Sequence, residues 1–201
     1  DDVDVFYSYG ISSDLISDCS GAGLIRVEQL EHIEEIDNYD SLSPKELASK
    51  LFVRYIATGE LWKMNDVFQL SIELYDTKES KVIWADKWKE NWENLTTIKN
   101  NLSDGLLKAL DTKPKVEQKV ETTNTEAYEF YLKAKYKFEK RENMEDTEIA
   151  RGFLRKAIEL DDNLLLAKNV LANTYYVIGD YDKAMEIYLE NLKKAEEIGD
   201  K

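Results

Sequence analysis

The stretch ARGFLRKAI, residues 150–158, decides the fold of the second half of this chain, because its pattern returns in AMEIYLENL, residues 184–192. Small or apolar residues stand three or four positions apart in both stretches, as on one face of a helix. The separation is 34 positions. A period of this length predicts stacked helix pairs that bury their apolar faces against one another. The paired positions are Ala150 and Ala184, Leu154 and Tyr188, Ala157 and Asn191, and Ile158 and Leu192.

The segment between the two copies predicts a helix, a tight turn and a second helix. Small Ala172 and Ala184 would let the two helices approach closely, with large side chains filling the space beside them. Gly179 is predicted to end the first helix. The residues that define the predicted repeats are Leu132, Tyr136, Ala150, Leu154, Ala157, Leu171, Ala172, Tyr175, Gly179, Ala184 and Tyr188.

This pattern resembles the tetratricopeptide repeat (TPR) in its period and its alternation of small and large residues. The resemblance implies an all-α domain of about two repeats over residues 126–201, whose surface binds a protein or peptide partner. A longer turn is expected in the first repeat, within Glu139 to Asp146. We also expect the array to continue beyond Lys201, with Ile187, Leu192 and Ala195 on its exposed final face.

The first half of the chain predicts mixed helices and strands. Ser12 or Ser13 is expected to cap a helix that runs to about Ser20, and residues 24–27 read as a short strand. The Gly21-Ala22-Gly23 turn lies between them and is no phosphate loop, because it follows a helix and precedes a strand. Residues 30–36 have near-helical spacing. Ser43-Pro44-Lys45-Glu46 is a capping box that begins a helix through about Leu51.

From Val53 the apolar period changes to two, which is typical of strands. Residues 55–64, 67–76 and 81–87 predict an antiparallel meander, followed by a helix capped by Thr96 or Thr97. The side chains predicted to face its core from the middle strand are Phe68, Leu70, Ile72 and Leu74. Trp62, Trp84, Trp88 and Trp92 cluster around the meander, where packing is a commoner use than an aromatic ligand platform. The fold class is therefore α+β, with this meander and one further strand.

The order of elements resembles the TolB amino-terminal-like (FlgO-like) domain, which precedes TPRs in bacterial signalling proteins. The motifs that carry the resemblance are residues 9–16, 24–27, 53–61, 74–77 and 82–88. The resemblance implies a domain over residues 1–110 with a truncated first strand, of which Asp4 to Tyr7 is a remnant or the following loop. Residues 111–125, poor in apolar side chains, would be the linker. In that family the domain often follows a class III adenylate or guanylate cyclase domain. The resemblance therefore gives the expectation of a cyclase or another catalytic domain upstream, at the cytoplasmic or periplasmic face of the bacterial inner membrane.

The composition narrows the possible partners. A formal net charge of −14 argues against a nucleic acid or an anionic membrane surface. No apolar run approaches the roughly 20 residues of a membrane helix. Cys19 is alone, which excludes an internal disulfide, and its apolar neighbours predict a buried thiol. His32 lacks partners at ligand spacing and is expected to face solvent. No residues are assigned to catalysis, to a cofactor or to a metal.

The leading hypothesis is a non-catalytic regulatory segment in which the repeats bind a protein partner, with homodimerisation also possible. The alternative is that the first domain binds a small ligand or nucleotide, and the repeats transmit the signal or dimerise. An enzyme is the least supported reading, because the sequence shows no constellation of reacting groups.

Overall fold

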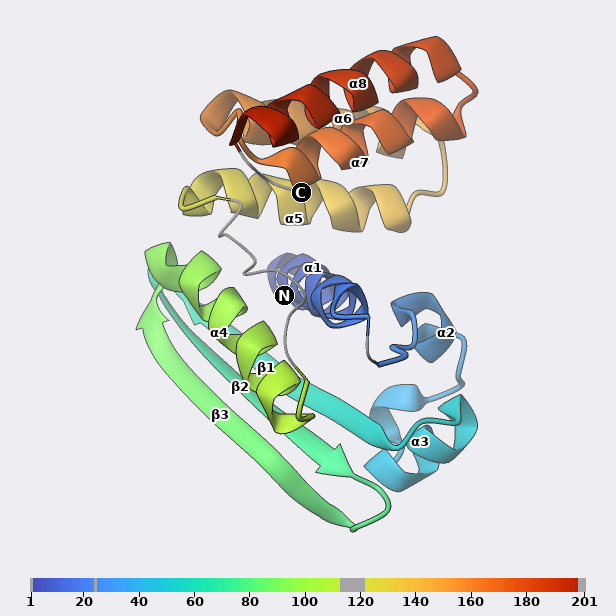
Figure 1. The fold of residues 1–201 in the computed structure, drawn as a ribbon, viewed down its shortest axis with the longest axis vertical. Coiled ribbons are helices and arrows are strands. Elements are labelled where there is room, and N and C mark those ends of the chain that lie inside the picture. The colour runs from blue at the N-terminus through green and yellow to red at the C-terminus, as the bar shows by residue number, and fades with distance from the viewer. Residues whose placement is uncertain (1, 24, 113–121, 199–201) are drawn as a thin grey trace. The chain divides into compact units, whose positions relative to one another are not determined.

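The computed structural model describes residues 2–23, 25–112 and 122–198, and shows an α+β chain (Figure 1). Contacts divide it into two compact units. Ile11–Gln118 form the sheet unit, and Asp1–Gly10 with Lys119–Lys201 form the helical unit. The grouping differs from the predicted domain over residues 1–110 at its first ten residues. The predicted linker, residues 111–125, lies largely outside the described residues.

The sheet is the predicted antiparallel meander. Strands β1 (Tyr55–Met64), β2 (Val67–Asp76) and β3 (Lys81–Asn91) pair in sequence order. The register places Leu70 opposite both Leu61 and Trp88. The four predicted core residues of β2 are buried, which confirms its alternation. Strand β3 extends to Asn91, beyond the predicted end at Lys87, because residues 88–91 pair with residues 67–70 of β2.

Helix α4 (Leu95–Ala109) follows the sheet after a 3-10 turn, η2 (Trp92–Asn94), and runs along one sheet face (Figure 1). Its apolar stripe is buried at Ile98, Leu102, Leu106 and Leu107. The predicted cap at Thr96 or Thr97 is wrong. The helix begins earlier, at Leu95, whose side chain is fully buried, so packing rather than a hydroxyl cap fixes its start.

Two short helices and a 3-10 turn precede the sheet: α2 (Leu30–Glu34), η1 (Tyr39–Ser41) and α3 (Pro44–Leu51). The capping box before α3 is confirmed, because the Ser43 side chain accepts from the Glu46 N–H and the Glu46 carboxylate accepts from the Ser43 N–H. Leu47, Ala48 and Leu51 pack with Ile56 of β1 in a small core cluster. The cap therefore orients the apolar face of α3 toward the start of the sheet.

The amino-terminal segment departs from prediction. Helix α1 spans Asp2–Gly21 without interruption, so the expected cap at Ser12 or Ser13 and the expected strand remnant at Asp4 to Tyr7 are both wrong. Tyr7 and Ile11 lie on one face of this helix and Tyr9 on the opposite face, and all three are buried, so α1 is enclosed on more than one side. The further strand is not formed at residues 25–27, which pair with no strand, and Leu24 lies outside the described residues.

The helical unit contains four consecutive helices besides the start of α1: α5 (Thr125–Glu139), α6 (Met144–Leu160), α7 (Leu165–Val177) and α8 (Tyr181–Ile198). Gly179 has φ +84° and ends α7 as predicted. Its N–H donates to the Tyr176 carbonyl, while the Asp180 N–H donates to that of Tyr175. The predicted long turn before α6 is wrong, because most of the extra residues extend α5 and α6.

Candidate functional site

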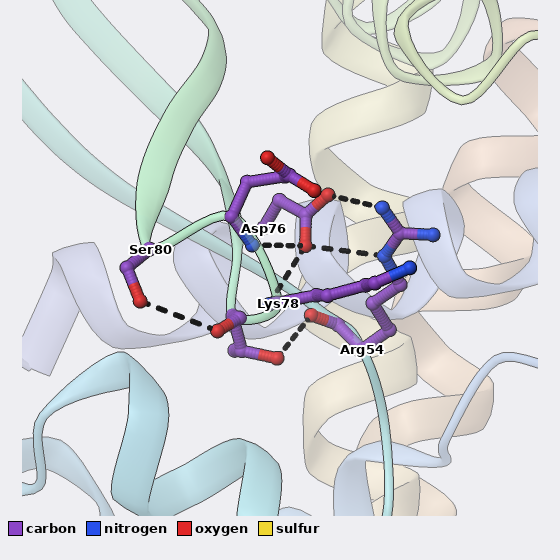
Figure 2. A network of polar contacts seen from close by, with 6 residues as sticks. Arg54, Asp76, Lys78 and Ser80 are labelled. Atoms are coloured by element: carbon purple, nitrogen blue, oxygen red, sulfur yellow. Dashed lines mark hydrogen bonds and ion pairs between the residues drawn. The ribbon is translucent and has the colours of Figure 1, made fainter.

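A polar network in the sheet unit joins the residue before β1 to the end of β2 (Figure 2). Arg54 donates from Nε and Nη2 to the two carboxylate oxygens of Asp76, at 3.1 and 2.6 Å. Asp76 also accepts from the N–H groups of Lys78 and Glu79. Thr77 donates from its backbone and its hydroxyl to the Arg54 carbonyl. All the bonds lie within the β2–β3 turn and the chain entering β1, so the network is structural.

This network also explains the electrostatics of Asp76. The hydrogen bonds from Arg54 lower the pKa of Asp76 from 3.8 to about 2, against the opposing effect of burial. A carboxylate bound bidentately by arginine, with further N–H donors, strongly favours its charged form. Its four hydrogen bonds hold it in the turn, so Asp76 is poorly suited to act as a general acid or base near neutral pH.

A second polar cluster lies between α1 and α4 in the sheet unit. Lys99 Nζ lies 2.6 Å from Asp18 Oδ2, and the Ser103 hydroxyl donates to the same oxygen at 2.5 Å. Cys19 beside them is buried, as predicted, and burial and the Asp18 charge raise its pKa to about 11. A thiol with so high a pKa is protonated at neutral pH and is a poor nucleophile.

His32 is exposed, as predicted. Its Nδ1 lies 2.7 Å from Glu28 Oε1, and this hydrogen bond raises the pKa of His32 above its ordinary value. Arg26 also pairs with Glu28, at 2.7 Å. Across residues 2–23, 25–112 and 122–198, no group of three or more His, Cys, Asp or Glu side chains could hold a metal ion. Within the same ranges, no helix has the length and apolar character needed to cross a membrane.

The repeat-defining residues lie mostly inside the helical unit. Ala150 and Ala184 occupy equivalent places in α6 and α8 and are 0% and 2% exposed. Tyr175 and Tyr188 are half-buried and keep their hydroxyls in polar contacts, with Arg155 and Asn173 respectively. Gly10 of α1 packs so closely on α5 that an added Cβ would lie 2.6 Å from Leu132 Cδ2. The fully buried members are Leu132, Ala150, Leu154, Ala157 and Ala172.

Helices α6 and α7 are joined through an arginine that sequence reasoning did not single out. Arg151 is buried and donates from Nε to the Thr174 hydroxyl at 3.0 Å and from Nη2 to the Thr174 carbonyl at 2.8 Å. Its guanidinium also lies 4.0 Å from the centre of the Tyr175 ring. The sequence could have pointed to Arg151 through its position, because it immediately follows Ala150, the small residue that the repeat pattern identifies.

The equivalent face of α8 is exposed and apolar. Tyr181, Met185, Leu189 and Leu192 stand 34 positions after Thr147, Arg151, Arg155 and Ile158. Arg151 is 4% exposed beneath α7, whereas Met185 is 58% exposed. We call the four residues Tyr181, Met185, Leu189 and Leu192 the α8 stripe. Tyr181, Leu189 and Leu192 are at least as exposed as Met185. Tyr176 of α7 extends the α8 stripe, because its ring contacts the edge of the Tyr181 ring at 5.3 Å between ring centres.

The α8 stripe is the feature of the described residues most typical of a binding surface, because a contiguous exposed apolar face marks an interaction site. Sequence reasoning placed Leu192 on such a face, and it is exposed. It also placed Ile187 there, which is wrong: Ile187 is buried on the opposite side of α8. The other stripe residues could have been predicted from their spacing, because Tyr181, Met185, Leu189 and Leu192 follow one another at four, four and three positions, as on one helix face.

In comparisons with known proteins, no family model and no curated protein matches this chain.

Proposed function

We propose that this chain is the non-catalytic, protein-interaction part of a larger bacterial signalling protein, and that its helical unit is a pair of TPRs. The exposed α8 stripe carries the proposal. The protein as a whole is highly charged, with a net charge of −14, yet this helix face exposes apolar side chains to water. Such a face is costly to leave in water and is typical of a partner-binding surface.

Three further observations support the repeat assignment. Antiparallel helix pairs follow one another with short turns, and α6 and α8 show equivalent burial at Ala150 and Ala184. Gly179 ends α7 with the paired hydrogen bonds of a helix stop. On the face of α6 that precedes the stripe by one period, Thr147 and Arg151 are buried, and Arg151 and Arg155 hydrogen-bond to residues of α7, as expected of neighbouring repeats.

The test is site-specific photo-crosslinking in cells that express the natural protein. A photoreactive phenylalanine replaces Leu189 in one variant and Met144 in the other, since Met144 is also exposed but lies on α6 away from the stripe. We expect a discrete protein adduct from position 189 and much less from position 144. Adding Met185→Glu should abolish the adduct. Equal adduct formation from both positions, or none from position 189, would contradict the proposed function.

A further inference from the structure

The α8 stripe has the dimensions of a helix-packing surface. Its residues recur every three or four positions, so their side chains lie on one face of α8 over about three helical turns. Each is more than half exposed. The remaining exposed large apolar side chains among the described residues form shorter groups on separate elements. The molecule that covers the stripe must therefore present an apolar face of similar length.

The equivalent face of α6 shows how the occupant must differ from α7. Arg151 on α6 requires acceptors, and Thr174 on α7 supplies both a hydroxyl and a carbonyl. Met185 replaces that arginine on α8 and has no N–H to donate. The occupant of the α8 stripe thus needs apolar side chains where α7 offers Thr174.

The other helices of the chain are poor candidates for this occupant. On α5, Leu132 and Tyr136 correspond to Leu171 and Tyr175 of α7, which places them on its contact face. Residues of α1 already cover that face: Gly10 packs on Leu132, and the Tyr9 ring lies 5.5 Å from that of Tyr136. Among the described residues, the uncovered helical stripe that is apolar throughout belongs to α8 itself.

We propose that the α8 stripe packs against the α8 stripe of a second copy of this chain, antiparallel about a two-fold axis that crosses the stripe between Met185 and Leu189. This inference rests on the proposed function and names the partner of the same surface. Tyr181 of one copy then meets Leu192 of the other, and Met185 meets Leu189. A two-fold contact requires such self-complementarity, because the same patch faces itself.

Charge complementarity supports this register. Asp182 directly follows Tyr181, and Lys193 directly follows Leu192, so both charges lie on the same side of the stripe. In the antiparallel pair, Asp182 of one copy faces Lys193 of the other, once on each side of the axis. Lys193 is well placed for this, with 78% of its side chain exposed and only a 4.0 Å contact to Glu197.

The first test measures the mass of the whole chain by sedimentation across a wide range of concentration. We expect a monomer–dimer equilibrium. Met185→Glu and Leu189→Glu should each weaken it by at least about tenfold, because each buries an unpaired carboxylate in the contact. Met144→Glu is the matched control and should leave it unchanged. Lys193→Glu should weaken the dimer about threefold, and adding Asp182→Lys should restore it.

The second test fixes the register. A Met185→Cys chain mixed with a Leu189→Cys chain, both carrying Cys19→Ser, should give a disulfide-linked heterodimer on mild oxidation. The two cysteines are placed on separate chains because positions 185 and 189 are neighbours on one helix face and could bond within α8. A chain that remains monomeric at every concentration, or a dimer insensitive to both stripe substitutions, overturns the proposal. So does photo-crosslinking of position 189 to its own polypeptide alone, which would mean that the same chain covers the stripe. If position 189 crosslinks to a different protein while the chain stays monomeric, self-pairing is wrong and the interaction function stands.

Discussion

Ala184 lies where α8 approaches its neighbours in the helical unit, and at 2% exposure its methyl group is enclosed by them. Its counterpart one period earlier, Ala150, is fully buried. A methyl group is the largest side chain that such a close helix contact admits without displacing its surroundings. Small size at this position is thus a requirement of packing.

Ala184→Leu should therefore destabilise the helical unit by about 1 to 3 kcal/mol, because the added atoms overpack a filled contact. Chemical denaturation followed by circular dichroism measures the change. Ala195→Leu, on the half-exposed part of the same helix, is the control and should shift stability by no more than about 0.5 kcal/mol. Equal effects of the two substitutions would contradict the close-approach role of Ala184.

Asp76 makes the sheet unit sensitive to acid. Its pKa in the folded protein is about 2, below its ordinary value of 3.8, because Arg54 stabilises the carboxylate. A depressed folded pKa contributes stability above the unfolded pKa, and that stability is lost as pH falls. We expect this contribution to be complete above about pH 4 and to disappear progressively toward pH 2.

Asp76→Asn should lower the melting temperature at neutral pH and flatten its dependence on pH between 4 and 2, since the titrating group is gone. Differential scanning calorimetry at several pH values measures both effects. Asp40→Asn is the control, because it removes an exposed carboxylate from η1. It should leave the change of melting temperature between pH 4 and pH 2 nearly the same as in the parent protein. A parent protein whose stability does not fall in this range would show that the Arg54–Asp76 pair contributes little.

At the scale of elements, α4 packs against β3 through a glycine. A Cβ added at Gly105 would collide with the ring of Trp84, so the helix can approach the strand only because no side chain is present. Gly152 in α6 differs, since nothing lies within 4 Å of the place its Cβ would take. The absence of a side chain is therefore required by packing at Gly105 but not at Gly152.

Gly105→Ala should destabilise the protein by about 1 to 3 kcal/mol, because the Trp84 ring must move. Gly152→Ala should stabilise it by about 0.5 to 1 kcal/mol, because alanine favours a helix and meets no neighbour. Thermal melts of both variants provide a matched comparison. Stabilisation by both would mean that α4 and β3 are less closely packed than the structure shows.

At the scale of the whole molecule, the net charge of −14 opposes any association between two copies. Salt screens this repulsion within about 8 to 10 Å at moderate ionic strength. The apolar contact of the α8 stripe is insensitive to screening, and the two exposed Asp182–Lys193 pairs are each worth only about 0.2 to 1 kcal/mol.

Raising sodium chloride from about 0.05 to about 0.5 M should therefore tighten the proposed dimer, because repulsion over the whole surface outweighs the rim pairs. Sedimentation equilibrium at several salt concentrations measures the dissociation constant. Lys193→Glu, which adds negative charge and removes the rim pairs, should show a steeper gain with salt. A dimer that weakens with salt would indicate that ion pairs, and not the α8 stripe, hold it together.

The sequence by itself determined the elements whose signals are local. Alternation located all three strands, Ser43 and Glu46 located the start of α3, and Gly179 located the end of α7, because dihedral preference and side-chain period act within a few residues. Tertiary structure decided whatever needed a distant partner. Residues 25–27 have strand-like composition but pair with no strand, and α1 continues through Ser12, where its neighbours Ile11 and Asp14 are buried. Ile187 is buried while Met185 on the same helix is exposed. The 34-residue period showed that α6 and α8 are equivalent helices, but only their packing shows that Arg151 on α6 is buried while Met185, its counterpart on α8, is exposed.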